Sequence, residues 1–106
     1  MVYVVQEALG KNILPAEDFG DLEVLLPPGN IVLSPVPTIK KLRDKLKDFG
    51  DNDYLLLIGD PAAIGIACMV ASDTNGGKVN MLKWDRQELR YYPVTVDLFH
   101  ERRNSG

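Results

Sequence analysis

Residues 54–71, YLLLIGDPAAIGIACMVA, decide how this chain folds. The run 54–58 is short and apolar, which is typical of a strand buried on both faces in a parallel sheet. The step Gly59-Asp60-Pro61 then stops the strand. Asp60 is suited to cap a helix, because its carboxylate accepts from free N–H groups of the first turn, and Pro61 fits the first helical position. The stretch therefore predicts a buried strand followed directly by a helix.

The helix that follows has no charged residue between positions 62 and 71. At 100° per residue, its wider apolar side contains Ile64, Ile66, Ala67, Cys68, Val70 and Ala71. The remaining side contains Ala62, Gly65, Met69, Ser72 and Asp73. The second side is small and flat, unlike the charged outer face of an ordinary surface helix, so we expect another part of the chain or another subunit to cover it. A membrane span is the alternative, but the Gly-Asp-Pro step favours strand plus helix.

Composition predicts one domain at residues 1–98 and a flexible C-terminal tail at 99–106. A net charge of −3 argues against a general nucleic-acid binder, which is normally basic. One Cys and one His exclude an internal disulfide and a Cys/His zinc site within one chain, and no motif indicates a cofactor. Residues 1–5 lack the basic region of a signal peptide, so we expect a cytoplasmic protein.

The other elements follow from turn signals and periodicity. Strands are predicted at 2–6 (at a sheet edge), 22–26, 31–33, 79–84 and 90–98. The runs 22–26 and 31–33 are expected to pair as a hairpin, a helical turn is expected at 15–19, and a helix is expected up to Phe49. The fold class is therefore α/β, a single mixed sheet of about five strands with two main helices in β-β-α-β-α-β-β order. Two helices would leave one sheet face poorly covered, which favours a homodimer.

The turn formed by Gly59, Asp60, Ala62 and Ala63 is the best candidate for a ligand site. It lies where a strand ends and a helix begins, and free N–H groups at such a point can receive a phosphate. However, the phosphate-binding glycine motifs are absent, and Asp60 would repel an anion. A helix cap is therefore the preferred interpretation. Asp51 and Asp53 lie before the strand and Asp60 after it, so we expect no metal site there.

The helix predicted over 38–49 is rich in basic residues. Lys40, Arg43 and Lys47, with Lys41 and Lys45, are candidates for contact with a nucleic-acid backbone. Asp44 and Asp48 lie between them at pairing distance along the helix, so a solvated outer face is the preferred interpretation.

Aromatic residues cluster in the last predicted hairpin. Trp84, Tyr91 and Tyr92, with Arg86 and Arg90, have the composition of a platform on which bases stack. Packing across the hairpin is the preferred interpretation, and Trp84 and Tyr92 are alternatively candidates for contact with a protein partner. Pro93 marks the second strand as an edge or a bulge.

Enzyme chemistry has little support in the sequence. Cys68 belongs to the apolar helix, whereas His100, the one histidine, falls in the tail, so a Cys–His nucleophile pair is not expected. No pair of carboxylates has a spacing that suggests acid–base catalysis. We therefore expect a protein that is not an enzyme.

Three segments together resemble small proteins of tailed bacteriophages: DYLLLIGDPAAIGIACMVAS at 53–72, GKVNMLKWDRQELRYYPVTVDL at 77–98 and LLPPGNIVLSPVPTIKKLRDKL at 25–46. The resemblance covers most of the chain and carries no catalytic residues. It implies a phage-encoded protein of the host cytoplasm that binds a host or phage protein. The leading hypothesis is therefore a small non-catalytic interaction or regulatory protein that forms a homodimer. The alternatives are a nucleotide- or nucleic-acid-binding module, using the turn at 59–61 or the helix at 38–49, and a structural component of the virion.

Overall fold

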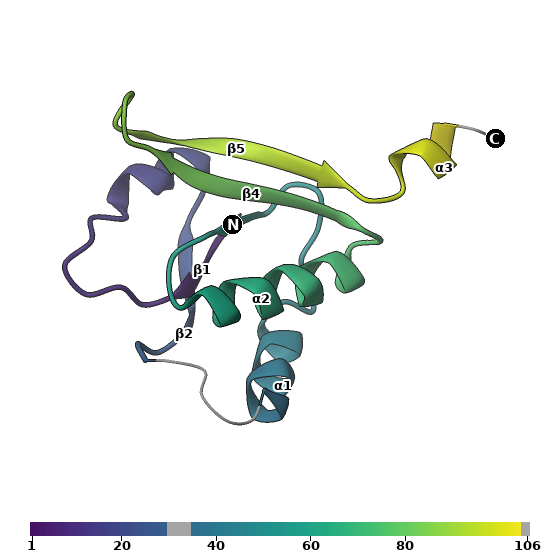
Figure 1. Ribbon diagram of the computed structural model, residues 1–106, viewed down its shortest axis with the longest axis horizontal. Coiled ribbons are helices and arrows are strands. Elements are labelled where there is room, and N and C mark those ends of the chain that lie inside the picture. Colours follow the sequence, from purple (N-terminus) through teal and green to yellow (C-terminus); the bar gives the residue numbers. More distant parts are fainter. Residues whose placement is uncertain (30–34, 105–106) are drawn as a thin grey trace.

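The computed structural model describes residues 1–29 and 35–104 and contains one five-stranded sheet in the order β2-β1-β3-β4-β5 (Figure 1). The strands are β1 (Val2–Gln6), β2 (Leu22–Leu26), β3 (Tyr54–Leu56), β4 (Lys78–Asp85) and β5 (Arg90–Asp97). The helices are the 3₁₀ helix η1 (Leu14–Phe19), α1 (Val36–Lys45), α2 (Pro61–Thr74) and α3 (His100–Asn104). β1 pairs in parallel with β2 and β3, β3 pairs in parallel with β4, and β5 runs antiparallel to β4. The predicted α/β class with one mixed sheet is confirmed.

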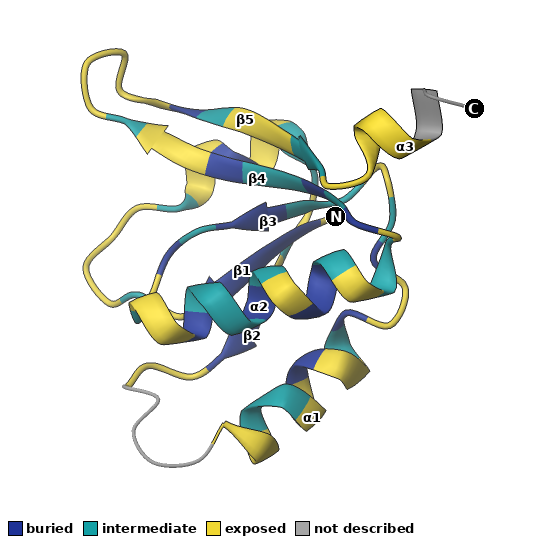
Figure 2. Cartoon of the chain, turned by 45° about the vertical axis from the view of Figure 1, so that its right-hand side comes forward, coloured by how far each residue is buried: buried dark blue, intermediate teal, exposed yellow. Residues whose placement is uncertain are grey.

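Helices α1 and α2 lie on one face of this sheet (Figures 1 and 2). Ala63, Ala67 and Ala71 recur every fourth residue of α2, and none of the three is exposed. Because an alanine ridge is short, it lets the helix backbone approach the sheet closely, where the helix packs in one core with Tyr3 and Leu55. The wider apolar side of α2 therefore faces the sheet, as its periodicity predicts.

The opposite face of the sheet is covered by residues 7–21, which contradicts the prediction of a poorly covered face. Ala16 of η1 is fully buried against this face, and the Phe19 ring meets the Tyr54 ring edge-on at 5.3 Å between centroids. Val2 and Leu56 beneath them are also fully buried. Only a few side chains of this segment pack against the sheet. The segment is therefore polar and irregular in sequence, although it covers the sheet face.

Two element predictions are wrong in position. β1 is not an edge strand, because it pairs with β2 on one side and β3 on the other, and all five of its residues are buried. α1 ends at Lys45 rather than at Phe49. The Phe49 N–H donates to the Leu46 carbonyl at 3.0 Å, and this tighter turn carries the Phe49 ring to the Tyr3 ring at 5.9 Å.

The predicted strand at 31–33, and with it the hairpin with 22–26, lies outside the described residues. The hairpin of β4 and β5 is confirmed, and β5 is an edge strand, as Pro93 indicates. Beyond β5, Phe99 packs on Gly77, and α3 projects from the body of the molecule (Figure 1). Residues 105–106 of the predicted tail lie outside the described residues.

Candidate functional site

The turn between β3 and α2 is a helix cap. The Asp60 carboxylate accepts from the N–H groups of Ala62 at 3.1 Å and Ala63 at 3.2 Å, through the same oxygen. Pro61 occupies the first helical position, so the cap predicted from the sequence is confirmed. Two donors that a phosphate would use are thus already engaged by a carboxylate of the protein.

Gln6, a residue that the sequence analysis did not single out, fixes the same turn from the end of β1. Its side-chain carbonyl accepts from the Asp60 N–H at 2.7 Å, and its Nε2 donates to the carbonyls of Pro27 at 2.9 Å and of Gly29. Gln6 is 4% exposed, and every polar atom of its amide has a partner. This amide ties together the loops that follow β1, β2 and β3. A polar side chain directly after four apolar strand residues is the signal in the sequence that marks it.

The close approach of Gln6 requires a glycine at position 59. Gly59 has a φ of 131°, in the region that L side chains rarely adopt, and a Cβ there would lie 2.5 Å from the Gln6 Cβ. The N–H groups of Asp60, Ala62 and Ala63 all donate within the protein, so this turn is organised as structure rather than as a site for an anion.

The outer side of α2 is open to solvent within the described part of the chain (Figure 2). Ala62 is exposed, Met69 is 67% exposed, and a Cβ added at Gly65 would meet no atom within 4 Å. Of the two expected covers, another part of the chain does not supply one within residues 1–29 and 35–104. The charged residue at its edge, Asp73, pairs with Arg43 of α1 at 2.9 Å. We call Ala62, Gly65 and Met69 the α2 face.

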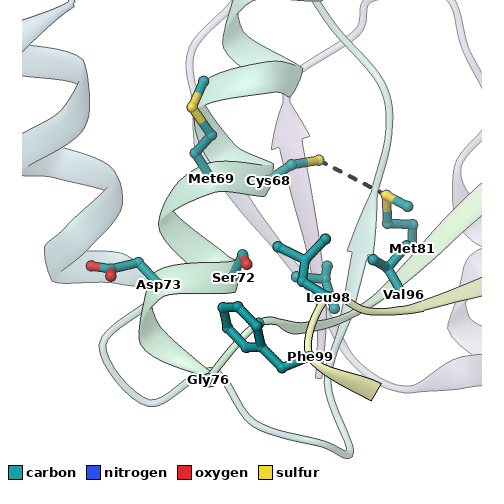
Figure 3. Close-up of a pocket in the computed structure, with 11 residues that line it drawn as sticks. Cys68, Met69, Ser72, Asp73, Gly76, Met81, Val96, Leu98 and Phe99 are labelled. Carbon is teal, nitrogen blue, oxygen red and sulfur yellow. Dashed lines mark hydrogen bonds between the residues drawn. The ribbon is translucent and has the colours of Figure 1, made fainter. Parts of the chain in front are cut away.

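An apolar groove lies beside the α2 face, between α2 and the hairpin of β4 and β5 (Figure 3). Its volume is about 590 Å³, and its lining includes Cys68, Met69, Met81, Val96, Leu98 and Phe99. Cys68 and Met81 point toward one another across it, with their sulfur atoms 3.9 Å apart, whereas Asp73 points away toward α1. Burial raises the pKa of the Cys68 thiol above its ordinary value, so the thiol remains protonated and apolar at neutral pH.

The groove is closed at the C-terminal end of α2 by residues that follow β5. The Phe99 ring lies against Gly77, where a Cβ would be 2.7 Å from the ring. Leu98 beside it is 64% exposed. Met69 and Leu98 thus leave large apolar surfaces in solvent on either side of the groove.

Trp84 and Tyr92 are not brought together. Trp84 pairs with Tyr91 and Lys83 with Tyr92 in the register of the hairpin, so alternation places Trp84 and Tyr92 on opposite faces of the sheet. Trp84 packs edge-on against the buried Tyr91 ring, with centroids 4.9 Å apart. Packing across the hairpin is therefore present, although Trp84 stays 39% exposed.

The basic residues of α1 are split between solvent and internal partners. Lys40 of α1 and Lys47 just after its end are exposed. Arg43 pairs with Asp73, and the Lys45 ammonium lies 3.4 Å from the Val24 carbonyl. The charge of Arg43 is thus balanced by Asp73 in an exposed ion pair.

Residues 1–29 and 35–104 contain neither a cluster of metal ligands nor a helix that could span a membrane. No three His, Cys, Asp or Glu side chains lie close enough together to hold a metal ion. None of the helices in this part of the chain combines the length and the apolar character that crossing a membrane requires.

Comparison with protein-family models matches residues 1–98, which contain every strand of the sheet, to the family described as Phage Pam3 gp32-like protein. No curated protein and no solved structure matches the chain. The family match confirms the resemblance to small phage proteins. With 98 residues matched out of 106, the chain belongs to the Phage Pam3 gp32-like protein family.

Proposed function

We propose that this phage protein is a non-catalytic interaction protein, which forms a homodimer through the α2 face and the adjoining groove and binds a host or phage protein in the host cytoplasm. The observation that carries the proposal is Met69, which is 67% exposed on an uncharged helix face at the lip of an apolar groove of about 590 Å³. Exposed apolar surface of this kind marks sites of protein contact.

A second copy suits this surface in shape. In a contact with twofold symmetry, the same patch of both chains meets, so each copy must offer both a projection and a depression. Met69 projects, and the groove between Cys68 and Val96 is the depression beside it. Both features therefore lie on one continuous surface, as a self-complementary patch requires.

A second copy also suits this surface in charge. The chain carries a net charge of −3, so two copies repel one another wherever their acidic residues meet. The α2 face carries no charge, and the carboxylate at its edge, Asp73, is already paired with Arg43. Contact through this surface brings no unpaired like charges together.

A binding role rather than catalysis is supported by the surroundings of the nucleophile. The pKa of Cys68 is raised by burial, which lowers the thiolate fraction at neutral pH. Cys68 lines the apolar groove, while His100 lines a different depression with Asp51 and Asn75. The thiol and the imidazole are therefore not arranged as a nucleophile and its base.

The test of the homodimer is the mass in solution, measured by light scattering or sedimentation over a range of concentrations. Wild type is expected at twice the 11.8 kDa mass of the chain. Gly65→Arg is expected at the mass of one chain, because the new side chain projects from the α2 face into the contact. A Cβ at position 65 meets open space, so the variant should fold normally.

Asn52→Arg is the matched control, since it adds the same charge at an exposed position in the turn before β3 and should leave the mass unchanged. The homodimer is ruled out if wild type stays at the mass of one chain at every concentration. Binding of a phage or host protein is checked separately, by capture from infected cells with wild type and Gly65→Arg side by side. A capture pattern identical to that of an unrelated bait would remove the interaction role.

A further inference from the structure

Another depression lies on the sheet face opposite α2, at the ends of β3 and β4. It has a volume of about 530 Å³, and its lining includes Lys11, Asn12, Ile58, Trp84, Arg86 and Tyr91. We call it the Trp84 pocket. The carboxyl ends of parallel strands, where this pocket lies, are the usual position of small-molecule sites in α/β sheets.

The Trp84 pocket is positively charged within an acidic protein. Lys11 and Arg86 contribute two cations, and no carboxylate belongs to its lining. Neither cation forms an ion pair within residues 1–29 and 35–104. Asp85 follows Trp84, so its side chain lies on the other face, where it accepts from the N–H groups of the hairpin turn. Two unpaired cations on a chain of net charge −3 indicate a site for an anion.

The same pocket holds an aromatic ring in a fixed position. Trp84 leaves 39% of its surface in solvent, although its ring is braced edge-on by the buried Tyr91 ring at 4.9 Å. Ile58, at the end of the central strand, adds an apolar wall. A braced, part-exposed indole is suited to stack on a planar ring, and two cations beside it are suited to hold a phosphate attached to that ring.

We propose that the Trp84 pocket binds a nucleotide unit, with the base against Trp84 and the phosphate between Lys11 and Arg86. The unit is either a free nucleotide or part of a single strand, because both present the same base and phosphate. It contains three residues of the base-stacking platform that the sequence suggests, Trp84, Tyr91 and Arg86, and adds Lys11 to them. It differs from the other two sites that the sequence suggests. The N–H groups of the turn at 59–61 are engaged, and the α1 surface has one of its cations, Arg43, paired with Asp73.

Binding can be followed directly, because Trp84 is the one tryptophan of the chain and its fluorescence reports stacking. The full chain is titrated at low salt with AMP, with a short single-stranded oligodeoxynucleotide, and with adenosine, inorganic phosphate and an acidic peptide. Saturable quenching by AMP or the oligodeoxynucleotide is expected, and it should weaken as salt rises. Tighter binding of the oligodeoxynucleotide identifies a single strand as the source, and equal or tighter binding of AMP identifies a free nucleotide.

The double variant Lys11→Gln, Arg86→Gln is expected to weaken binding by about tenfold or more, since both phosphate contacts are lost. In wild type the Lys11 and Arg86 side chains are exposed and form no ion pair within the described residues, so the two substitutions should leave folding unaffected. The matched control, Lys40→Gln on α1 with Lys47→Gln just beyond its end, removes the same charge and should bind as wild type does. The proposal is overturned if neither nucleotide ligand quenches Trp84 or if the control pair weakens binding equally. It is also overturned if phosphate, adenosine or the peptide binds as tightly as the nucleotide ligands.

Discussion

At the scale of single residues, two glycines that bracket the start of α2 have opposite roles. Gly59 combines a φ of 131° with a position where a Cβ would lie 2.5 Å from Gln6, whereas a Cβ at Gly65 would meet open space. The first glycine is required by the backbone and by its neighbour. The second is not required by the fold of the single chain, which is consistent with a role on its outer surface.

Gly59→Ala is expected to destabilise the chain by about 2 kcal/mol or more, because it adds backbone strain and displaces the Gln6 amide. Gly65→Ala in the middle of a helix is expected to stabilise it by about 0.5–1 kcal/mol. Urea denaturation of both variants and wild type at one low protein concentration gives the comparison. A Gly59→Ala variant as stable as wild type would contradict the role given to this turn.

The buried Tyr3 and Tyr91 and the half-buried Cys68 give an expectation for how stability depends on alkaline pH. Burial raises the pKa of Tyr3, Tyr91 and Cys68, and Asp53 adds to the effect at Tyr3. The unfolded chain therefore loses these protons at lower pH than the folded chain, so the free energy of unfolding falls as pH rises above the ordinary values of 9.0 for Cys and 10.0 for Tyr. Denaturation midpoints measured from neutral to alkaline pH should decline over that range. A flat profile would contradict the burial of these groups.

Single residues also show which side-chain contacts can be predicted from the sequence alone. The cap at Asp60 was predictable, because its partners lie two and three positions away. The role of Gln6 was not, because its partners lie 21, 23 and 54 positions away, and only the assembled sheet brings them together. The Trp84 pocket was predictable only in part. Trp84, Tyr91 and Arg86 belong to one hairpin, whereas Lys11 comes from the distant covering segment.

At the scale of elements, the local sequence pattern predicted whether a segment is a helix or a strand better than it predicted where the element ends or where it lies in the sheet. α2, β3 and the β4–β5 hairpin follow from apolar periodicity and turn residues, which act over a few positions. The end of α1 does not, because the core draws Phe49 inward through a turn after Leu46. The place of β1 in the centre of the sheet depends on pairing with two distant strands, which no local pattern specifies.

The cap of α2 gives a prediction at this scale. Asp60→Ala is expected to cost about 1 kcal/mol of stability, because two N–H groups of the first turn lose their acceptor, whereas Asp60→Asn should retain most of it. Arg43→Gln, which breaks the exposed pair with Asp73, is expected to cost only about 0.5 kcal/mol or less. Chemical denaturation ranks the three variants. A larger loss for Arg43→Gln than for Asp60→Ala would show that the contact between helices, not the cap, holds α2 in place.

At the scale of the whole molecule, the two faces of the sheet are closed by different means. α1 and α2 cover one face, and residues 7–21 cover the other, so the sheet itself does not require a partner. Among the described residues, the α2 face with its groove and a charged pocket on the opposite side are open. The case for self-association therefore rests on the helix, as its uncharged sequence suggested, and no longer on an uncovered sheet.

The most direct test of that case is the rate at which peroxide oxidises Met69, measured by mass spectrometry over a range of protein concentrations. Met1, which is 42% exposed, is an internal reference in the same chain. If a second copy covers the α2 face, the rate at Met69 relative to Met1 should fall several-fold as concentration rises in wild type, and should stay high in Gly65→Arg. A ratio that remains high in wild type at every concentration would contradict the account, because it would show that the α2 face stays in solvent.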